Sequence, residues 1–301
     1  MKNPIIDGWY ADPEARVYNG KVYIYVTRSL PFEEQHNLDL IVSDDLIHFT
    51  KKESILDMST FKGATFAIWA PSVVEQNGRY YIIFAANNIH EDGEDGGLYI
   101  GVSDSPCGPF KNIFPDGRPF INVFYNGAQP IDAHFFKDGE NIWLYYGGWG
   151  HLNVARLNET LRELLPVTEG SDDKVLEITP KEYVEAPCVL KIGDKYHLMY
   201  STGKWCDSSY CVKAAISDTP WGEFDYYTDI MRANEMAEGP GHNGAFSFGG
   251  KDYVTYHRRI VGDKNSHHRI LCIDELKTEN GRLQPVIMTE KRYYFVKGSK
   301  N

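Results

Sequence analysis

Three acids stand in short, related settings along the sequence: Asp12, Asp132 and Glu185. They belong to the triplets Ala-Asp-Pro, Ile-Asp-Ala and Glu-Ala-Pro, each just before an alternating apolar run. Aspartate is a poor strand former, and turn capping explains any one such acid by itself. If the fold gathers the three carboxyl groups, however, their like charges raise one another's pKa values, which is typical of functional sites. The elements that position these acids therefore decide how they are interpreted.

A hairpin pattern recurs five times along the chain. Each copy places a two-residue turn between alternating apolar runs rich in tyrosine and β-branched residues, as in VYNGKVYIYV and VEQNGRYYIIF. The turns come at near-equal intervals and are Asn19-Gly20, Asn77-Gly78, Asp138-Gly139, Gly193-Asp194 and Gly249-Gly250. Such turns accept positive φ angles and join antiparallel strands. The sequence therefore predicts five hairpins.

Each hairpin is followed by a related second half, which predicts a third strand and a polar turn into a fourth. These segments are LIVSDDLIHF (40–49), LYIGVSDSPCGPF (98–110), LNVARLNETL (152–161), VKAAISDTPWGEF (212–224) and RILCIDEL (269–276). Helical periodicity is almost absent, and no Pro/Gly/Ser-rich linker divides the chain. The sequence predicts an all-β fold, a five-bladed β-propeller formed by residues 1–301 as a single domain.

The first strand of each propeller blade lines a central channel, so equivalent positions of different blades converge there. In the two units without an acid, the corresponding stretches are WAPS (69–72) and GHNG (241–244). Because these units lack an acid, the repeat itself does not require one. We therefore expect Asp12, Asp132 and Glu185 to meet at one end of the channel.

The ordered triplets, with Trp69-Ala70-Pro71 between the first two, closely resemble glycoside hydrolase family 43 from about Asn3 to Leu283. The resemblance implies a five-bladed propeller that cleaves arabinose- and xylose-containing glycans with inversion of anomeric configuration. It implies that Asp12 is the general base, that Asp132 tunes the pKa and orientation of the proton donor, and that Glu185 is the general acid. Inversion requires the base and the acid to stand roughly 6.5–9.5 Å apart, which leaves room for a water molecule.

The resemblance implies three further pocket residues. Trp69 would pack its ring against a sugar, and a core tryptophan is the alternative. Arg258, in TYHRR, matches an arginine that binds a sugar hydroxyl or the base, and a surface arginine is the alternative. His242, in GPGHNG, matches a histidine on the axis beneath the pocket that contacts a structural calcium ion or its waters, and a buried histidine without metal is the alternative. The chemistry itself requires no cofactor.

The predicted function is an inverting exo-glycosidase acting on oligosaccharides or polysaccharides such as arabinan, arabinoxylan or xylan fragments. We expect an α-L-arabinofuranosidase, with β-xylosidase as the alternative. Many xylosidases of the family carry an additional C-terminal sandwich domain that closes the pocket, and we expect this sequence to end too soon for one. A sugar-binding propeller without catalysis is the alternative from another class, but it would repeat its binding residues in every blade. Invertase-like families carry Asn-Asp-Pro-Asn-Gly where this chain has Ala-Asp-Pro-Glu, which counts against a retaining enzyme.

The composition of the chain argues against several classes of binding partner and against a membrane span. The net charge of −11 over 301 residues argues against a nucleic-acid partner, which rewards a basic surface. No apolar run is long enough to span a membrane, and the opening MKNPIIDGWYADP lacks the apolar core of a signal peptide. We therefore expect a cytoplasmic protein as the sequence stands, with export of a longer precursor as the alternative. The stretch SHHRI (266–270) is interpreted as surface.

Overall fold

All five predicted hairpins are present in the computed structural model, which describes residues 3–290. The hairpins are β1 (Tyr10–Tyr18) with β2 (Lys21–Arg28), β5 (Trp69–Gln76) with β6 (Arg79–Ala86), β9 (His134–Asp138) with β10 (Asn141–Tyr146), β14 (Glu185–Ile192) with β15 (Lys195–Thr202), and β18 (Glu238–Phe248) with β19 (Lys251–Arg259). Asn19 and Asn77 have φ angles of 50° and 53°, as the Asn-Gly turns require.

Each hairpin continues into an antiparallel sheet. The third strands are β3 (Leu38–Ser43), β7 (Gly97–Ser103), β11 (Asn153–Leu157), β16 (Cys211–Ser217) and β20 (Arg269–Glu275). The outer strands are β4 (Thr50–Lys52), β8 (Lys111–Asn112), β12 (Leu164–Leu165), β13 (Val175–Glu177) and β17 (Asp225–Met231). The prediction of four strands per blade holds for blades 1, 2 and 4. It is corrected for blade 3, where β12 and β13 both pair with β11, and for blade 5, whose sheet has three strands among the described residues.

The remaining elements are short. A separate hairpin, β21 (Thr278–Glu279) with β22 (Arg282–Leu283), follows blade 5. The 3-10 helices are η1 (Phe32–Glu34), η2 (Met58–Thr60) and η3 (Tyr125–Gly127). Between residues 3 and 290, no helix is long and apolar enough to cross a membrane.

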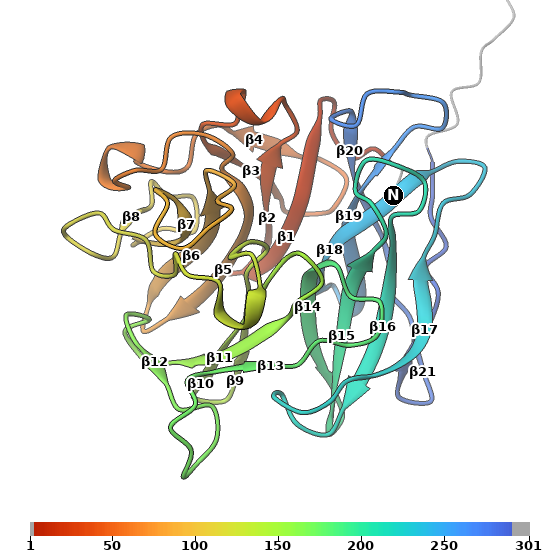
Figure 1. Cartoon of the computed structure of the whole chain (residues 1–301). Coiled ribbons are helices and arrows are strands. Elements are labelled where there is room, and N and C mark those ends of the chain that lie inside the picture. Colours follow the sequence, from red (N-terminus) through yellow and green to blue (C-terminus); the bar gives the residue numbers. More distant parts are fainter. Residues whose placement is uncertain (1–2, 291–301) are drawn as a thin grey trace, which may run out of the picture.

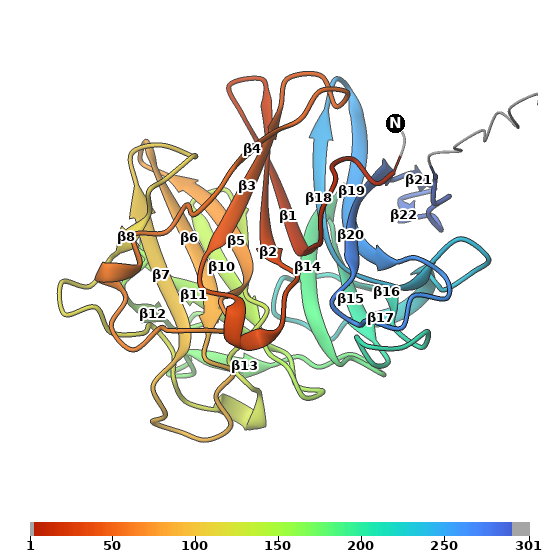
Figure 2. The ribbon, with the colours of Figure 1, turned by 90° about the horizontal axis from the view of Figure 1, so that it is seen from above.

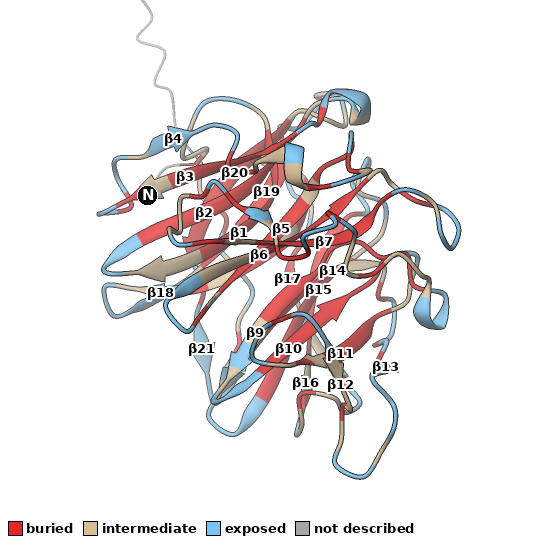
Figure 3. Ribbon diagram, turned by 90° about the vertical axis from the view of Figure 1, so that its left-hand side faces the viewer, coloured by how far each residue is buried: buried red, intermediate tan, exposed pale blue. Residues whose placement is uncertain are grey.

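The five blades form a closed ring, which confirms the predicted β-propeller (Figure 1). Around the ring, the inner strands contact one another in the order β1, β5, β9, β14, β18 and back to β1. The view in Figure 2 shows the first and last blades side by side, with β1 next to β18. One apolar core lies between each pair of adjacent blades. Strand interiors are accordingly buried and hairpin tips exposed, as Figure 3 shows.

The N-terminal segment lies along the outer edge of blade 5. The Ile5 amide donates a hydrogen bond to the Leu271 carbonyl at 3.1 Å. The buried Asn3 side chain donates to the Ile273 carbonyl at 3.1 Å and accepts from the Ile273 amide at 2.8 Å. Asn3 and Ile5 therefore occupy the edge that a fourth strand covers in other blades, and the segment from Asn3 to β1 joins the two ends of the ring.

Each inner strand is preceded or interrupted by one residue in the left-handed backbone region. The register of β1, β5, β14 and β18 shifts at a bulge, and the same residue of each blade takes a positive φ. These residues are Asp12 (51°), Ala70 (51°), Asp132 (54°), Ala186 (60°) and His242 (40°). Such bulges re-aim side chains at the end of a sheet, and aspartate tolerates this conformation better than most residues. This geometry explains why a strand pair begins with an aspartate.

Candidate active site

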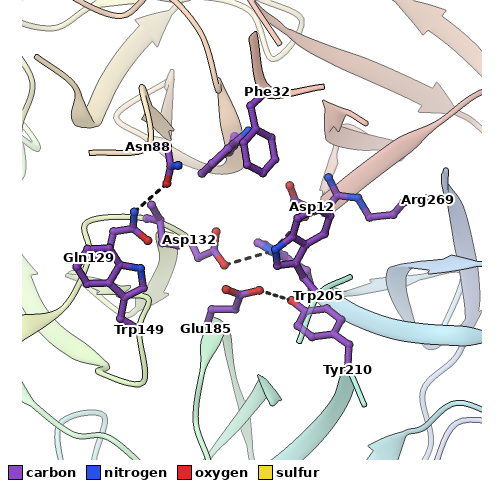
Figure 4. Close-up of a pocket in the computed structure, with 13 residues that line it drawn as sticks. Asp12, Phe32, Asn88, Gln129, Asp132, Trp149, Glu185, Trp205, Tyr210 and Arg269 are labelled. Atoms are coloured by element: carbon purple, nitrogen blue, oxygen red, sulfur yellow. Dashed lines mark hydrogen bonds and ion pairs between the residues drawn. The ribbon is translucent and has the colours of Figure 1, made fainter. Parts of the chain in front are cut away.

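A pocket of ≈ 310 Å³ opens at one end of the channel (Figure 4). Every blade contributes at least one side chain to it. The lining residues are Asp12, Phe32, Trp69, Asn88, Gln129, Ile131, Asp132, Trp149, Glu185, Trp205, Tyr210, His242 and Arg269. The structure thus brings the three predicted acids together with Trp69 and His242, and it leaves Arg258 outside.

Asp12 is a buried carboxylate with a cationic partner. The Nη1 atom of Arg269 lies 3.4 Å from Asp12 Oδ1, and the Arg269 Nε donates to the Ser29 hydroxyl at 2.8 Å. Burial by itself would raise the pKa of Asp12, but the Arg269 guanidinium, assisted by a hydrogen bond with Thr27, holds that pKa below its ordinary value. Asp12 is therefore ionised near neutral pH.

Asp132 and Glu185 form a second, different carboxyl site beside it (Figure 4). The Ala186 amide donates a hydrogen bond to the Asp132 carboxyl group. Burial raises the pKa of both acids, and the neighbouring charges of Glu185 and Asp12 raise that of Asp132 further. Two buried carboxyl groups that interact this strongly titrate as a pair. The pair therefore retains a proton at a pH where Asp12 has lost its own.

Tyr210 contacts this pair and was not predicted from the sequence. Its hydroxyl donates to Glu185 Oε1 at 2.8 Å, and burial raises the pKa of Tyr210 well above its ordinary value, so it stays a donor. Gly241 allows this position, because a Cβ atom there would lie 1.9 Å from the Tyr210 ring. The hydrogen bond occupies one oxygen of Glu185 and leaves the other to carry a proton.

His242, which lines the pocket, and His257, which lies behind Asp12, are neutral near pH 7. Burial lowers the pKa of His242 and lowers that of His257 well below its ordinary value. The Asp12 amide donates to His257 Nδ1 at 3.2 Å, which places the proton of that neutral ring on Nε2. His242 Nδ1 lies 3.4 Å from Asp12 Oδ1 and 3.5 Å from Asp132 Oδ2, so one imidazole reaches both acids.

Trp69 lies on the pocket wall with its indole fixed. Its Nε1 donates to Gln35 Oε1, and its ring packs against Phe32 with centroids 4.8 Å apart. Gln35 is fully buried, and its own amide donates to the Arg28 carbonyl at 2.8 Å. Trp69 therefore combines both sequence interpretations, since it lines the pocket while its inner edge packs against the core between blades 2 and 3.

The assignment of Arg258 to the pocket is corrected to Arg269. Arg258 follows His257 in β19, and successive side chains of a strand point to opposite faces. Because His257 faces Asp12, Arg258 points away, and its guanidinium donates to the carbonyls of Met236 and, at 3.3 Å, Thr289. Arg269 lies in the SHHRI stretch, which we predicted to be surface. Because side chains alternate along a strand, His257 and Arg258 could not both face the pocket, and this rule could have excluded Arg258.

The groups beneath His242 do not fit a calcium ion. Glu14 is the buried carboxylate there; it forms an ion pair with Arg16, accepts from Ser72 Oγ at 3.1 Å and lies 3.5 Å from His134 Nδ1. Calcium takes six to eight oxygen ligands, whereas the oxygens of Glu14 are already partnered and a guanidinium supplies the positive charge. Within residues 3–290, no group of three or more His, Cys, Asp or Glu side chains is arranged to hold a metal ion.

A propeller whose pocket holds one ionised carboxylate and one proton-sharing carboxyl pair is equipped for acid–base hydrolysis. Comparisons with known proteins agree with this class. The sequence profile described as "Glycosyl hydrolases family 43" matches residues 1–283, and the chain therefore belongs to glycoside hydrolase family 43.

Its relatives carry different activities in their names. "Beta-D-galactofuranosidase xynD" from Aspergillus niger is 38% identical, over 95% of this chain and 85% of that protein. "Xylosidase/arabinosidase" from Bacteroides ovatus is 27% identical, over 94% of this chain and 96% of its own. The crystal structure of a thermostable family-43 glycoside hydrolase superposes with a TM-score of 0.78 at 25% identity and covers 97% of both chains.

We predict that calcium does not stabilise this propeller, because Arg16 neutralises the carboxylate beneath His242. Melting temperatures measured in excess EDTA and in millimolar CaCl₂ should coincide. An ion bound at 100 times its Kd would add about 2.7 kcal/mol of stability. A domain of this size would then melt several degrees higher, which would contradict the prediction.

Proposed function

We propose that this protein is an inverting exo-glycosidase that releases a terminal furanosyl residue from oligosaccharides. The observation that carries the proposal is the contrast between Asp12 and the Asp132–Glu185 pair within one pocket. Carboxyl groups whose environments push their pKa values apart supply a base and an acid at the same pH. Binding alone gives no reason to hold a proton on one carboxyl pair and to exclude it from the neighbouring carboxylate.

In the proposed mechanism Asp12 acts as the general base. It is ionised and takes a proton from a water molecule on the face of the sugar opposite the departing group. Glu185 acts as the general acid and gives its proton to the bridging oxygen as the glycosidic bond breaks. Asp132 keeps the proton on the pair through its negative charge. The Tyr210 hydrogen bond to Oε1 directs that proton to the other oxygen of Glu185.

The pocket size supports exo-action. At ≈ 310 Å³ it lies at the low end of the range for small-molecule sites, about 300–1,000 Å³. Beneath it, Glu14 and Arg16 close the channel: the Arg16 guanidinium donates to the carbonyls of Val73 at 2.7 Å and Phe135 at 2.8 Å. A blind pocket of this kind holds the end of a chain, whereas an endo-acting enzyme needs an open groove.

The named activities of the relatives support a furanose. α-L-Arabinofuranose and β-D-galactofuranose share the configuration of their ring carbons and differ in the exocyclic arm on the ring. A galactofuranosidase at 38% identity and a xylosidase/arabinosidase at 27% are thus compatible with one furanose-shaped site. We therefore place terminal β-D-galactofuranosides beside the α-L-arabinofuranosides expected from the sequence, and natural substrates among glycans that carry either sugar.

β-Xylosidase is the second candidate, because the name of the Bacteroides ovatus relative includes that activity. Three aryl glycosides rank the candidates directly: the α-L-arabinofuranoside, the β-D-galactofuranoside and the β-D-xyloside. We expect either furanoside to be hydrolysed with a higher kcat/KM than the xyloside. A preference for the xyloside would show that the pocket selects a pyranose and not a furanose. No turnover of any of the three glycosides would favour a sugar-binding propeller.

The stereochemistry of hydrolysis tests the role of Asp12. Proton NMR of the first-formed sugar should show the anomer opposite to the substrate bond, because water and not Asp12 attacks the anomeric carbon. The spectrum is recorded within seconds to minutes, before the free sugar mutarotates. Retention of configuration would identify a nucleophilic carboxylate, as in invertase-like enzymes.

Two kinds of substrate distinguish the role of Glu185 as the acid from the role of Asp12 as the base. Glu185→Ala should lower kcat/KM for a natural linkage by about 10²–10⁴, whereas an aryl glycoside whose leaving group needs no proton should retain much more of its rate. Asp12→Ala should lower both rates alike, because water activation is needed whichever group departs. Equal losses for both substrates in the Glu185 variant would remove it from the acid role.

Asp132→Asn should shift the basic limb of the pH–rate profile to lower pH by about one unit or more. That limb reports loss of the last proton from the Asp132–Glu185 pair, and the amide removes the negative charge that retains the proton. Tyr210→Phe is the matched control with the opposite sign, because it removes a hydrogen bond that lowers the pKa of Glu185. A basic limb unmoved by Asp132→Asn would contradict the role of Asp132.

A further inference from the structure

Trp149 lies at the mouth of the pocket and takes no part in the acid–base steps. Half of its surface is exposed (50%), which makes it one of the largest exposed apolar side chains among the described residues. Its φ angle is 59°, a conformation that bulky side chains rarely adopt. Strain of this kind persists only where the surroundings impose it, often at ligand sites.

The surroundings of Trp149 fix its backbone from both sides. Before it, the Gly148 amide donates to the Gln129 carbonyl at 3.0 Å; after it, the Gly150 amide donates to the Val184 carbonyl at 3.1 Å. A Cβ atom at Gly148 would lie 2.7 Å from the end of the Ile131 side chain, so a larger residue there would have to displace that side chain. The indole is therefore presented by a tethered turn and not by a loose loop.

Two aromatic rings support the indole. Phe124 lies 5.2 Å and His90 5.8 Å from the Trp149 ring, between centroids. The Phe124 segment is in turn held by Asp92, whose carboxylate accepts the Phe124 amide at 2.7 Å. An exposed ring with supporting rings and a fixed backbone has the properties of a preformed stacking surface.

The place of Trp149 relative to Glu185 identifies what it would stack on. Its turn is hydrogen-bonded to Val184, the residue immediately before the proposed proton donor. Figure 4 shows Trp149 on the side of Gln129 and Asn88, across the pocket from Arg269 and Phe32. Because Glu185 protonates the bridging oxygen, the departing group lies on the Glu185 side of the pocket, within reach of this ring.

We propose that Trp149 is the platform for the first sugar of the leaving group and thereby makes the enzyme selective for glycan linkages over simple alkyl glycosides. The inference rests on the proposed function and adds a specificity-determining residue to it. Trp205, the tryptophan near Arg269, is less exposed than Trp149, and its ring lies among the Arg269 guanidinium at 5.3 Å, His267 at 5.6 Å and Phe32 at 5.8 Å.

The test compares two substrates that share the same furanose and both need a proton from Glu185. One is a furanosyl disaccharide, whose leaving group is a sugar ring; the other is the methyl furanoside, whose leaving group has no ring. Trp149→Ala should lower kcat/KM for the disaccharide about tenfold or more, mainly through KM, as expected for loss of a well-packed aromatic contact. The methyl furanoside should change less than about twofold, and Trp149→Phe should recover most of the selectivity.

Controls separate this assignment from misfolding and from failure of the proposed function. Inhibition by the free furanose reports the pocket behind the platform and should be unchanged in Trp149→Ala, which also verifies the fold. Trp205→Ala should lower both rates alike, because it disturbs Arg269. Equal effects of Trp149→Ala on both substrates, or none, would overturn the platform while leaving the enzyme assignment intact. Failure of the wild-type protein to hydrolyse either furanoside would overturn the proposed function and the platform with it.

Discussion

The structure depends on how the blades satisfy the backbone amides that their inner bulges remove from the sheet. A buried amide without an acceptor costs about as much as a lost hydrogen bond, so each bulge needs a partner. In three blades the partner is a side chain from the second strand of the preceding blade. The pairs are Ala70 with Thr27 (2.9 Å), His242 with Ser201 (3.0 Å) and Asp12 with His257 (3.2 Å). These contacts connect neighbouring blades at the end of the channel where the pocket opens.

The same rule involves one of the proposed catalytic groups. The amide of Ala186, the bulge residue of blade 4, donates to the carboxyl group of Asp132 in blade 3. Asp132 therefore closes the ring between two blades and at the same time sits against Glu185, the residue before Ala186. Fold and site are not separable here, because moving Asp132 to relieve the repulsion between the acids would leave a bulge amide without its acceptor. The repulsion therefore remains, and together with burial it raises the pKa values of the pair.

Sequence reasoning succeeded where the determinants are local. Asn-Gly turns and alternating apolar runs specify hairpins by themselves, and five repeats then imply where Asp12, Asp132 and Glu185 converge. It failed where strand register and loop conformation determine which side chains reach the pocket. Arg258 and Arg269 differ only in which face of a strand they occupy, and Tyr210 reaches the pocket from a loop whose course no short pattern encodes. The extra strand of blade 3 and the N-terminal edge of blade 5 likewise depend on contacts between distant segments.

The placement of charge along the axis explains why the Asp132–Glu185 pair, and not Asp12 or Glu14, keeps a proton. Glu14 is paired with Arg16 and Asp12 with Arg269, so each of these buried carboxylates has its own guanidinium. The Asp132–Glu185 pair is held by hydrogen bonds from an amide and a phenol, and the histidine that reaches Asp132 is neutral. The charge of Arg269 lowers the pKa values of both acids, but burial outweighs it, and a buried carboxyl pair without a cation in direct contact lowers its charge by retaining a proton. Because Arg269 contacts Asp12 and not the pair, Asp12 is ionised while the pair holds a proton, and the position of one guanidinium group therefore separates the protonation states of neighbouring carboxyl groups.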